Sequence, residues 1–401
     1  MNKISKLLNI LKRNGLYPPF YRIESAGTNP EVIINGKKYL IFCSNNYLGL
    51  ATRSEIIRAA ERALKKHGIG PGGSRFLCGN IALLEQLDHE TAKLVGAEDA
   101  ITFPTGYMAN LAIFKALMDP LIGNLPHKKG SGIIFSDEFN HGSIVDGCKL
   151  SYAKKIIFRH IDMKDLETKI STVPNNTPKM ITIEGVFSVE GDLVPLPEVV
   201  NIAKKYNAIL MIDDAHGVGV MGEKGGGTAQ HFGLESKIDI IMGSFDKALG
   251  GMGGFLAGSK EIVEYLRIAS RSYMLSSAVP AVLAGGLIKA IKICETKKGL
   301  REKLFSNANY LRKNLEEIGF RVLGKGEIPV NPVLIGDEIK AIKFSEKLFR
   351  RGIYAPTYRW PMVPKGTARI RVTTMSTHTK KYLDTLLEAF EKSGKELKLI
   401  P

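Results

Sequence analysis

Short runs of consecutive apolar residues alternate with helical patterns between about residues 50 and 280 of this chain. Two such runs are AILMI (208–212) and IDIIM (238–242), the second interrupted only by Asp239, and helical spacing is clear over 54–68 and 196–206. A strand that lacks polar alternation is buried on both faces, as it is when helices connect and cover parallel strands. The pattern therefore predicts an α/β fold with a mostly parallel central sheet covered on both sides.

The pattern changes after residue 280. A long helical stretch runs to about residue 319, and shorter strands and helices follow to the C-terminus. We predict three parts: an N-terminal arm and interface segment (1–50), a large ligand-binding domain (51–285), and a long linking helix with a small C-terminal α/β domain (286–401). The chain is long enough to bury the cores of two or three domains.

Several functional classes are excluded or disfavoured by missing motifs. GIGPGG (68–73) fits the dinucleotide fingerprint G-x-G-x-x-G, but a helix precedes it where a strand is required, so we reject a nicotinamide enzyme. There is no P-loop. The four cysteines form no C-x-x-C pair, so no zinc or redox motif is expected, and a reducing cytoplasmic setting is favoured. No apolar run reaches the roughly 18–20 residues of a membrane span.

The chain is basic, with 56 Lys and Arg against 40 Asp and Glu. These charges are scattered and accompany no nucleic-acid-binding motif, so we expect no nucleic-acid partner; attraction of an anionic small substrate fits as well. The first 20 residues are basic and amphipathic, with Ile4, Leu7, Leu8 and Leu11 at helical spacing. A membrane-surface helix is one interpretation, and an arm that packs on a partner subunit is the one we favour.

One lysine and one aspartate stand just beyond two neighbouring apolar strands. Asp213 follows the run 208–212, and Lys247 follows the run 238–242 within GSFDKALGG. Ligands bind at the carboxyl ends of parallel strands. An amine that can form a Schiff base and an acid that can protonate a ring nitrogen suit pyridoxal phosphate. A turn or helix-cap role fits the adjacent Asp214 better than it fits Asp213.

A phosphate cradle is expected in FPTGYMANLA. Thr105, Gly106 and Tyr107 lie between a predicted strand and a predicted helix, and a helix N-terminus offers N–H groups to a phosphate. Ser244, three residues before Lys247, offers another hydroxyl. Together with Lys247 and Asp213, these residues predict a complete pyridoxal-phosphate site with no metal.

From SNNYLGL (44–50) to KSGKELKLI (392–400) the chain resembles the α-oxoamine synthases, acyltransferases of the fold-type-I pyridoxal-phosphate (aminotransferase-like) superfamily. The resemblance implies a homodimer that condenses an α-amino acid with an acyl-CoA or acyl-carrier-protein thioester. It implies that Lys247 holds the cofactor covalently and that Asp213 pairs with its ring nitrogen. It further implies that His216 contacts the ring hydroxyl, that His141 stacks on the ring and polarises the thioester carbonyl, and that Ser188 in EGVFSVEGD, the motif opened by Glu184, lies beside the cofactor.

The resemblance also implies the substrate side of the site. Arg371 and Arg359 would bind the amino-acid carboxylate, and Asn45 would reach it at the subunit interface. Ser74 stands where the glycine-specific branch that makes 5-aminolevulinate usually has threonine, so serine leaves room for a Cα substituent. Three positions depart from the family pattern, and they affect the acyl-substrate assignment rather than the cofactor: Asp246, Met362 and Gly226.

The substrates are the least determined part. We favour alanine with a pimeloyl thioester, a step of biotin synthesis. The alternatives are serine with palmitoyl-CoA, in sphingolipid synthesis, and glycine with acetyl-CoA. An aminotransferase or cysteine desulfurase of the same fold, or an inactive regulatory subunit, is a more distant alternative; the presence of Lys247 argues against the last.

Overall fold

The computed structural model describes residues 2–13 and 16–401. Their contacts form two compact units. The large unit comprises Asn45–Ser306 and Gly324–Ile328; the small unit comprises the described residues up to Ser44, Asn307–Leu323 and Pro329–Pro401. Helix α12 (Lys298–Ile318) is shared between them. No helix of the described residues is long and apolar enough to cross a membrane.

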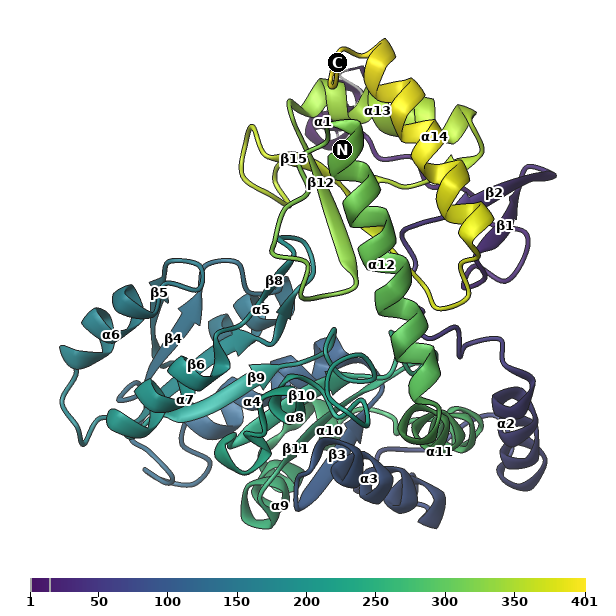
Figure 1. The fold of residues 1–401 in the computed structure, drawn as a ribbon. Coiled ribbons are helices and arrows are strands. Elements are labelled where there is room, and N and C mark those ends of the chain that lie inside the picture. The colour runs from purple at the N-terminus through teal and green to yellow at the C-terminus, as the bar shows by residue number, and fades with distance from the viewer. Residues whose placement is uncertain (1, 14–15) are drawn as a thin grey trace. The chain divides into compact units, whose positions relative to one another are not determined.

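A seven-stranded sheet forms the centre of the large unit, in the order β3-β11-β10-β9-β6-β4-β5 (Figure 1). Its strands are β3 (Asp99–Phe103), β4 (Ile133–Asp137), β5 (Lys154–Phe158), β6 (Lys179–Glu184), β9 (Ile209–Asp213), β10 (Ile240–Ser244) and β11 (Gly254–Gly258). Neighbouring strands are parallel except where β11 pairs with β10 and β3. The predicted mostly parallel sheet is confirmed.

Strand β11 falls where the sequence shows only a glycine run after Lys247. Glycine disfavours strands in general, but all five residues here are buried. An added Cβ at Gly254 would lie 2.4 Å from the Gly106 Cα atom, and one at Gly258 would lie 2.4 Å from the Asp239 carbonyl oxygen. The glycines are therefore needed for close packing around this strand.

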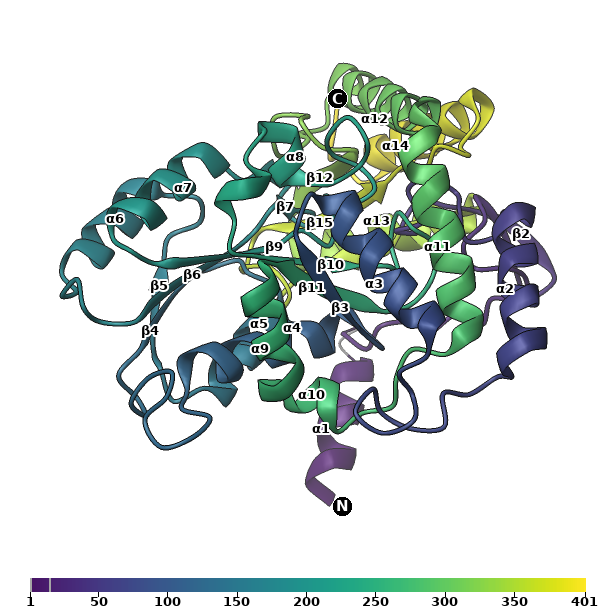
Figure 2. The ribbon, with the colours of Figure 1, turned by 90° about the horizontal axis from the view of Figure 1, so that it is seen from below.

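Helices cover both faces of the sheet (Figure 2). One face carries α4 (Gly106–Met118), α5 (Gly142–Leu150), α9 (Lys260–Ala269) and α10 (Arg271–Met274); the other carries α3 (Ala82–Val95), α6 (Met163–Ser171) and α7 (Leu196–Lys205). Also in this unit are α2 (Ser54–His67), α8 (Thr228–Phe232), α11 (Ala281–Thr296), a 3-10 turn (Glu235–Lys237) and the hairpin β7 (Val186–Phe187)–β8 (Asp192–Leu193). The core between the sheet and α4 is continuous and apolar.

The small unit contains two three-stranded sheets, β1-β2-β13 and β12-β15-β14. Its elements are α1 (Asn2–Arg13), β1 (Glu31–Ile34), β2 (Lys37–Ile41), β12 (Val330–Gly336), α13 (Glu338–Arg350), β13 (Ile353–Tyr354), β14 (Thr357–Tyr358), β15 (Ala368–Thr373) and α14 (Lys380–Glu396). Phe344 and Phe390, on α13 and α14, lie in its apolar core. The fold class predicted for the C-terminal part, a smaller α/β domain, is confirmed.

Candidate active site

Asp213 and Lys247 lie at neighbouring strand ends, as predicted. Asp213 is the last residue of β9 and pairs in register with Met242 of the parallel strand β10. Lys247 comes three residues after the end of β10, and its side chain is only 15% exposed. An acid and an amine are therefore held at the edge of the sheet where parallel strands present their carboxyl ends.

The Asp213 carboxylate is 5% exposed and has neutral hydrogen-bond donors on both oxygens. Oδ2 accepts from the Asn110 amide nitrogen at 2.7 Å, and Oδ1 accepts from the Ala215 backbone N–H at 3.1 Å. Glu184 ends the adjacent strand β6 and pairs with Asp213 in register. Burial, and then the charge of Asp213, raise the pKa of Glu184 well above its ordinary value.

Asp214, the next residue, has a structural role. Both of its oxygens accept hydrogen bonds from Thr228, one from the backbone N–H and one from the hydroxyl, at the start of α8. An added Cβ at Gly185, Gly217 or Gly227 would lie within 2.5 Å of its carboxylate. Burial raises the pKa of Asp214 to about 7. The expectation that Asp214 is the helix cap and Asp213 the functional acid agrees with these contacts.

His216 is held from both ring nitrogens. The Tyr47 hydroxyl lies 2.8 Å from Nδ1, and the Ser188 hydroxyl lies 3.1 Å from Nε2. Tyr47 comes from the SNNYLGL segment and is 1% exposed, whereas Ser188 follows β7. The structure therefore brings together His216 and Ser188, two residues that were predicted separately.

His141 is the N-cap residue of α5. Its Nδ1 atom accepts from the Ser143 backbone N–H at 3.3 Å and lies 2.7 Å from the Ser143 hydroxyl oxygen. The Tyr107 ring lies edge-on to the imidazole, with 6.5 Å between ring centroids. The ring of His141 is exposed, which leaves it available to a ligand.

The predicted phosphate cradle is the N-terminus of α4. The Thr105 hydroxyl caps it by accepting from the Met108 N–H at 3.2 Å. An added Cβ at Gly106 would lie 3.2 Å from the Ser244 hydroxyl oxygen, so Ser244 stands beside the first turn of the helix. The Tyr107 hydroxyl donates to Asp146, which turns this side chain toward α5.

Glycines pack the Lys247 loop against the SNNYLGL segment. Gly250 has a positive φ of 69° and donates to the Lys247 carbonyl. An added Cβ there would lie 2.4 Å from the Ala51 backbone nitrogen. Only glycine allows this approach, and it brings the loop of Lys247 to the segment that carries Asn45 and Tyr47.

Asp246, one of the departures from the family pattern, forms an ion pair with Lys247, with 3.4 Å between Nζ and Oδ1. Its carboxylate also accepts from the Ser244 hydroxyl. The side chain is about half exposed. A negative charge therefore lies between the predicted Schiff-base lysine and the predicted phosphate cradle.

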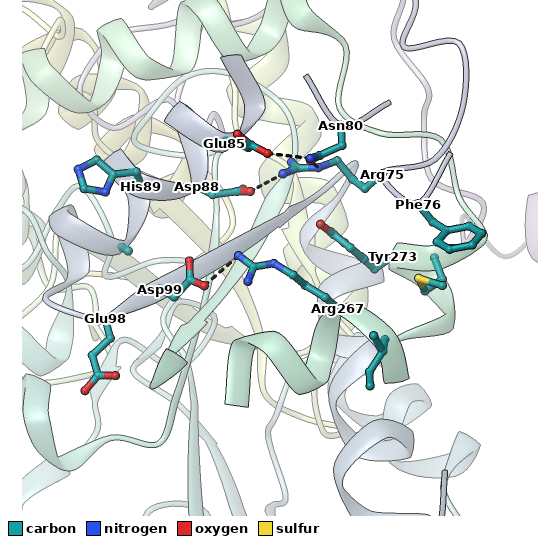
Figure 3. A pocket seen from close by; sticks show the side chains of 13 residues that line it. Arg75, Phe76, Asn80, Glu85, Asp88, His89, Glu98, Asp99, Arg267 and Tyr273 are labelled. Carbon is teal, nitrogen blue, oxygen red and sulfur yellow. Dashed lines mark hydrogen bonds and ion pairs between the residues drawn. The ribbon is translucent and has the colours of Figure 1, made fainter. Parts of the chain in front are cut away.

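Ser74 precedes a cavity of the large unit lined by several charged side chains, which we call the Arg75 pocket (Figure 3). The pocket holds about 570 Å³ and is lined by Arg75, Asp88, Asp99, Arg267 and Tyr273, among others. Arg75 forms a 2.6 Å ion pair with Asp88, and both side chains are 5% exposed. Ser74 itself is buried.

Arg371 and Arg359 belong to the small unit, so their role at the Lys247 site stays a prediction. Arg371 lies on β15, is 4% exposed and faces the Tyr358 ring with its guanidinium carbon 5.8 Å from the centroid. Arg359 donates to the Leu16 carbonyl at 2.5 Å. Burial raises the pKa of the nearby Cys43 thiol to about 12, against the opposing charge of Arg371.

Comparisons with known proteins identify the family. The family model described as aminotransferase class I and II matches residues 37–390. An 8-amino-7-oxononanoate synthase from Thermoanaerobacter pseudethanolicus is 42% identical over 99% of this chain and 98% of its own. The chain belongs to the α-oxoamine synthase family.

Two solved structures have a fold similar to that of this family member. A serine palmitoyltransferase variant from S. paucimobilis, solved with bound PLP and myriocin, has a TM-score of 0.91 and 31% identity, covering 100% of this chain and 99% of its own. An 8-amino-7-oxononanoate synthase from Francisella tularensis has a TM-score of 0.75 and 27% identity, covering 89% and 98%. The predicted family and the fold-type-I architecture are confirmed.

The side chains of this α-oxoamine synthase fit pyridoxal phosphate. The cofactor requires an amine, an acid facing a ring nitrogen and a phosphate cradle, and the structure places Lys247, Asp213 and the N-terminus of α4 around the same sheet edge. Gly106 leaves the cradle open where a side chain would collide with the Met242 methyl group. The chemistry of this set agrees with a phosphorylated aldehyde that carries a basic ring.

Sequence reasoning missed three residues that hold this α-oxoamine synthase site together: Tyr47, Asn110 and Ser143. Each lies inside a motif that was singled out for another residue. A signal existed for Asn110, because an amide inside the mostly apolar helix pattern 106–118 is buried at a cost unless it meets polar partners.

Proposed function

We propose that this chain condenses L-alanine with a pimeloyl thioester, as an 8-amino-7-oxononanoate synthase in biotin synthesis. The observation that carries the proposal is the 42% identity to such an enzyme over nearly the whole of both chains. The completeness of the site around Lys247 supports catalysis over an inactive regulatory role. The cofactor is pyridoxal phosphate.

The residues of the large unit divide the chemistry among them. When bound, pyridoxal phosphate supplies an electron-accepting ring. Lys247 Nζ would hold the cofactor aldehyde, and as a free amine it would take the proton from Cα of the amino acid. Asp213, whose carboxylate accepts hydrogen bonds from two neutral donors, would keep a proton on the ring nitrogen. His216 and Ser188 would bind the ring hydroxyl.

The remaining roles concern the two substrates. His141 would lie over the ring and would donate a hydrogen bond to the thioester carbonyl oxygen, which becomes more negative as the new carbon–carbon bond forms and the thiol leaves. Carbon dioxide then leaves from the amino-acid carboxyl group. Before that step Arg371 binds this carboxylate through two parallel hydrogen bonds from its guanidinium, assisted by Arg359 and Asn45.

Ser74 supports alanine over glycine as the amino acid. Threonine at this position would add one methyl group near Cα of the substrate, and one such group is worth about 1–3 kcal/mol of discrimination. Serine at 74 leaves this space open for the alanine methyl group.

We also propose that the working form is a homodimer in the cytoplasm. The loop around Ser74 exposes Ile69, Phe76 and Leu77 by 81%, 67% and 71%, an apolar surface that a partner subunit would cover. Helix α1 has no buried residue and presents Ile4 and other apolar side chains to solvent. The four free cysteines fit a reducing compartment. Sedimentation of an active monomer would refute the dimer.

A matrix of substrates tests the proposal. Glycine, alanine and serine are each combined with acetyl-, pimeloyl- and palmitoyl-CoA, and thiol release is followed. We expect the highest kcat/KM for alanine with pimeloyl-CoA. Arg371→Ala should raise the alanine KM before it lowers kcat, since it removes ground-state binding. Exclusive use of glycine with acetyl-CoA would overturn the substrate assignment but leave the family unaffected.

Serine with palmitoyl-CoA is the second candidate. The serine palmitoyltransferase structure has the higher TM-score, 0.91 against 0.75 for the Francisella enzyme. The 42% identical relative is named an 8-amino-7-oxononanoate synthase, so we rank serine with palmitoyl-CoA second.

The covalent role of Lys247 has a direct test. Borohydride reduction of the yellow holoenzyme, followed by digestion and mass mapping, should place the cofactor on Lys247. The absorbance band should be absent from Lys247→Ala and retained in Lys205→Ala, which alters an exposed lysine paired with Glu167. A label on another lysine contradicts the assignment.

A further inference from the structure

An unbroken chain of hydrogen bonds joins the predicted ring-nitrogen acid to the predicted stacking histidine. The Asn110 amide nitrogen donates to Asp213 Oδ2 at 2.7 Å and to the Ser143 hydroxyl oxygen at 2.8 Å. That hydroxyl lies 2.7 Å from Nδ1 of His141. Asn110 is fully buried and Ser143 is 1% exposed. This hydrogen-bond chain therefore runs through the interior, from the end of β9 through α4 to the first turn of α5.

Chemistry fixes the direction of the two hydrogen bonds from the Asn110 amide, and the backbone N–H of Ser143 decides the direction of the bond to His141. A carboxylate only accepts, so the NH2 end of Asn110 must face Asp213, and its second N–H points at Ser143. The Ser143 oxygen already accepts that bond, so its own proton is free to go to His141 Nδ1. The Ser143 backbone N–H, which can only donate, points at the same nitrogen at 3.3 Å.

Two donors at Nδ1 determine which nitrogen of the neutral imidazole carries the proton. A nitrogen that accepts hydrogen bonds holds a lone pair, so the proton must be on Nε2. His141 is exposed, so Nε2–H is presented as a donor to whatever binds over this edge. Such a ring cannot take a proton at Nδ1 without losing the bond from the Ser143 backbone N–H and reversing the bond to its hydroxyl.

We propose that Asn110 and Ser143 are positioning residues that fix His141 as the Nε2–H tautomer, so that it acts in the reaction as a hydrogen-bond donor to the acyl thioester. The identity of the acceptor rests on the proposed function; the tautomer does not. The Asn110 carbonyl oxygen supports a donor role for this side chain, because it has no hydrogen-bond partner among the described residues although it is buried. Such a group destabilises a fold, which argues that the amide is kept for its N–H groups.

Nitrogen-15 NMR of the holoenzyme labelled at its eight histidines reads the tautomer directly. The His141 signals are assigned by their loss in His141→Gln. We expect a protonated Nε2 and an unprotonated Nδ1 in the unaltered protein. Asn110→Asp removes the donor to Ser143 and reverses that hydroxyl, so Nδ1–H should become populated. Ser143→Ala, which keeps the backbone donor, should give a smaller change in the same direction. A protonated Nδ1 in the unaltered protein overturns the proposal.

Kinetics separate positioning from general damage to the fold. Ser143→Ala should lower kcat/KM for the acyl thioester by roughly three- to tenfold, the effect of one hydrogen bond, while the dissociation constant of the amino acid changes little. Ser393→Ala, which removes a buried hydroxyl in α14, is the matched control and should change neither quantity. The proposed role of this hydrogen-bond chain is refuted if Ser143→Ala weakens amino-acid binding as much as it lowers kcat/KM for the thioester. It is also refuted if the His141 tautomer is unchanged in both Ser143→Ala and Asn110→Asp. If pimeloyl-CoA proves not to be the donor, the NMR result still stands.

Discussion

Two regions of the large unit that hold buried charges give them different partners. In the Arg75 pocket, Arg75 and Asp88 form an ion pair at 2.6 Å, and Arg267 lies 2.9 Å from Asp99. Each guanidinium there faces a carboxylate of this chain, as Figure 3 shows.

At the Lys247 site, defined by Lys247, Asp213 and His216, opposite charges are not paired in this way. Asp213 takes its hydrogen bonds from the neutral donors of Asn110 and Ala215, and the recorded ion pair of Lys247 is with the half-exposed Asp246. A buried acid and a buried amine at neighbouring strand ends suit a ligand that carries both a basic ring and an electrophilic carbon.

The difference shows how to distinguish structural charge from functional charge. A buried pair that neutralises itself is satisfied without a ligand, and removal of one partner leaves the other uncompensated. A buried charge held by neutral donors leaves its net charge available for a partner from outside. The comparison therefore predicts that substitutions in the two regions affect different properties, stability in the Arg75 pocket and turnover at the Lys247 site.

The largest effect is expected from Asp213→Asn. An amide cannot hold a proton on the ring nitrogen, so turnover should fall by roughly 10²–10⁴-fold while amino-acid binding weakens much less. Steady-state kinetics and spectral titration with alanine measure the two quantities. Asp214→Asn is the control, because that carboxyl caps α8, and it should alter stability rather than the turnover of folded protein. Near-normal turnover of Asp213→Asn would remove Asp213 from its role.

Asp88→Asn tests the other side of the comparison. It leaves the buried Arg75 guanidinium without its charge partner, so we expect the free energy of unfolding to fall by about 3–5 kcal/mol. The cofactor absorbance band should persist below the lowered melting temperature. Urea denaturation and the visible spectrum measure these effects. Loss of the band without loss of stability would mean that the pocket is functional and that the comparison is wrong.

The predictable part of the site was the part encoded locally. Lys247 and Asp213 each follow a short apolar strand, and parallel strands bring such ends to the same edge, so their juxtaposition follows from the pattern alone. The N-terminus of α4 likewise follows from one strand–turn–helix segment. These inferences need no knowledge of side-chain contacts across the fold.

The unpredicted part depends on contacts between distant segments. Asn110 and Asp213 are 103 residues apart, and Tyr47 and His216 are 169 residues apart. No spacing rule in a sequence relates such pairs. Strand β11 was also missed, because its glycines reflect close packing around Gly106 and Asp239 rather than a strand propensity.

A third, smaller effect concerns His160, which lies between Asp137 and Asp192 at 3.0 and 3.3 Å. Burial lowers its pKa, but hydrogen bonds to Asp137 and Asp192, with charges including Glu190, outweigh burial and raise it to about 9. The ordinary value is about 6.5, so this contribution to stability is complete below pH 6.5 and is lost as pH rises to about 9.

The loss amounts to up to about 3 kcal/mol, because one pKa unit corresponds to 1.36 kcal/mol. Thermal denaturation between pH 6 and pH 9.5 measures it, with His160→Gln as the variant in which this pH dependence should flatten. Asp192 lies on β8, which pairs with β7, and Ser188 comes directly after β7. An unchanged slope in His160→Gln would show that other groups govern stability in this range.

The smallest effect is expected from Asp246→Ser, at the point where the Lys247 site departs from the family pattern. The Asp246 carboxylate lies beside the Ser244 hydroxyl and within 3.4 Å of Lys247 Nζ. A negative charge there repels a phosphate bound at the cradle, but half of the side chain is exposed and solvent screens the repulsion. The serine variant should therefore bind pyridoxal phosphate roughly two- to tenfold more tightly, measured by fluorescence titration of the apoprotein.

Asp99→Ser, which removes a carboxylate from the Arg75 pocket, should leave that affinity unchanged. Weaker binding in Asp246→Ser would instead mean that Asp246 orients the lysine, and the site would then resemble the Arg75 pocket in relying on a charge pair of its own.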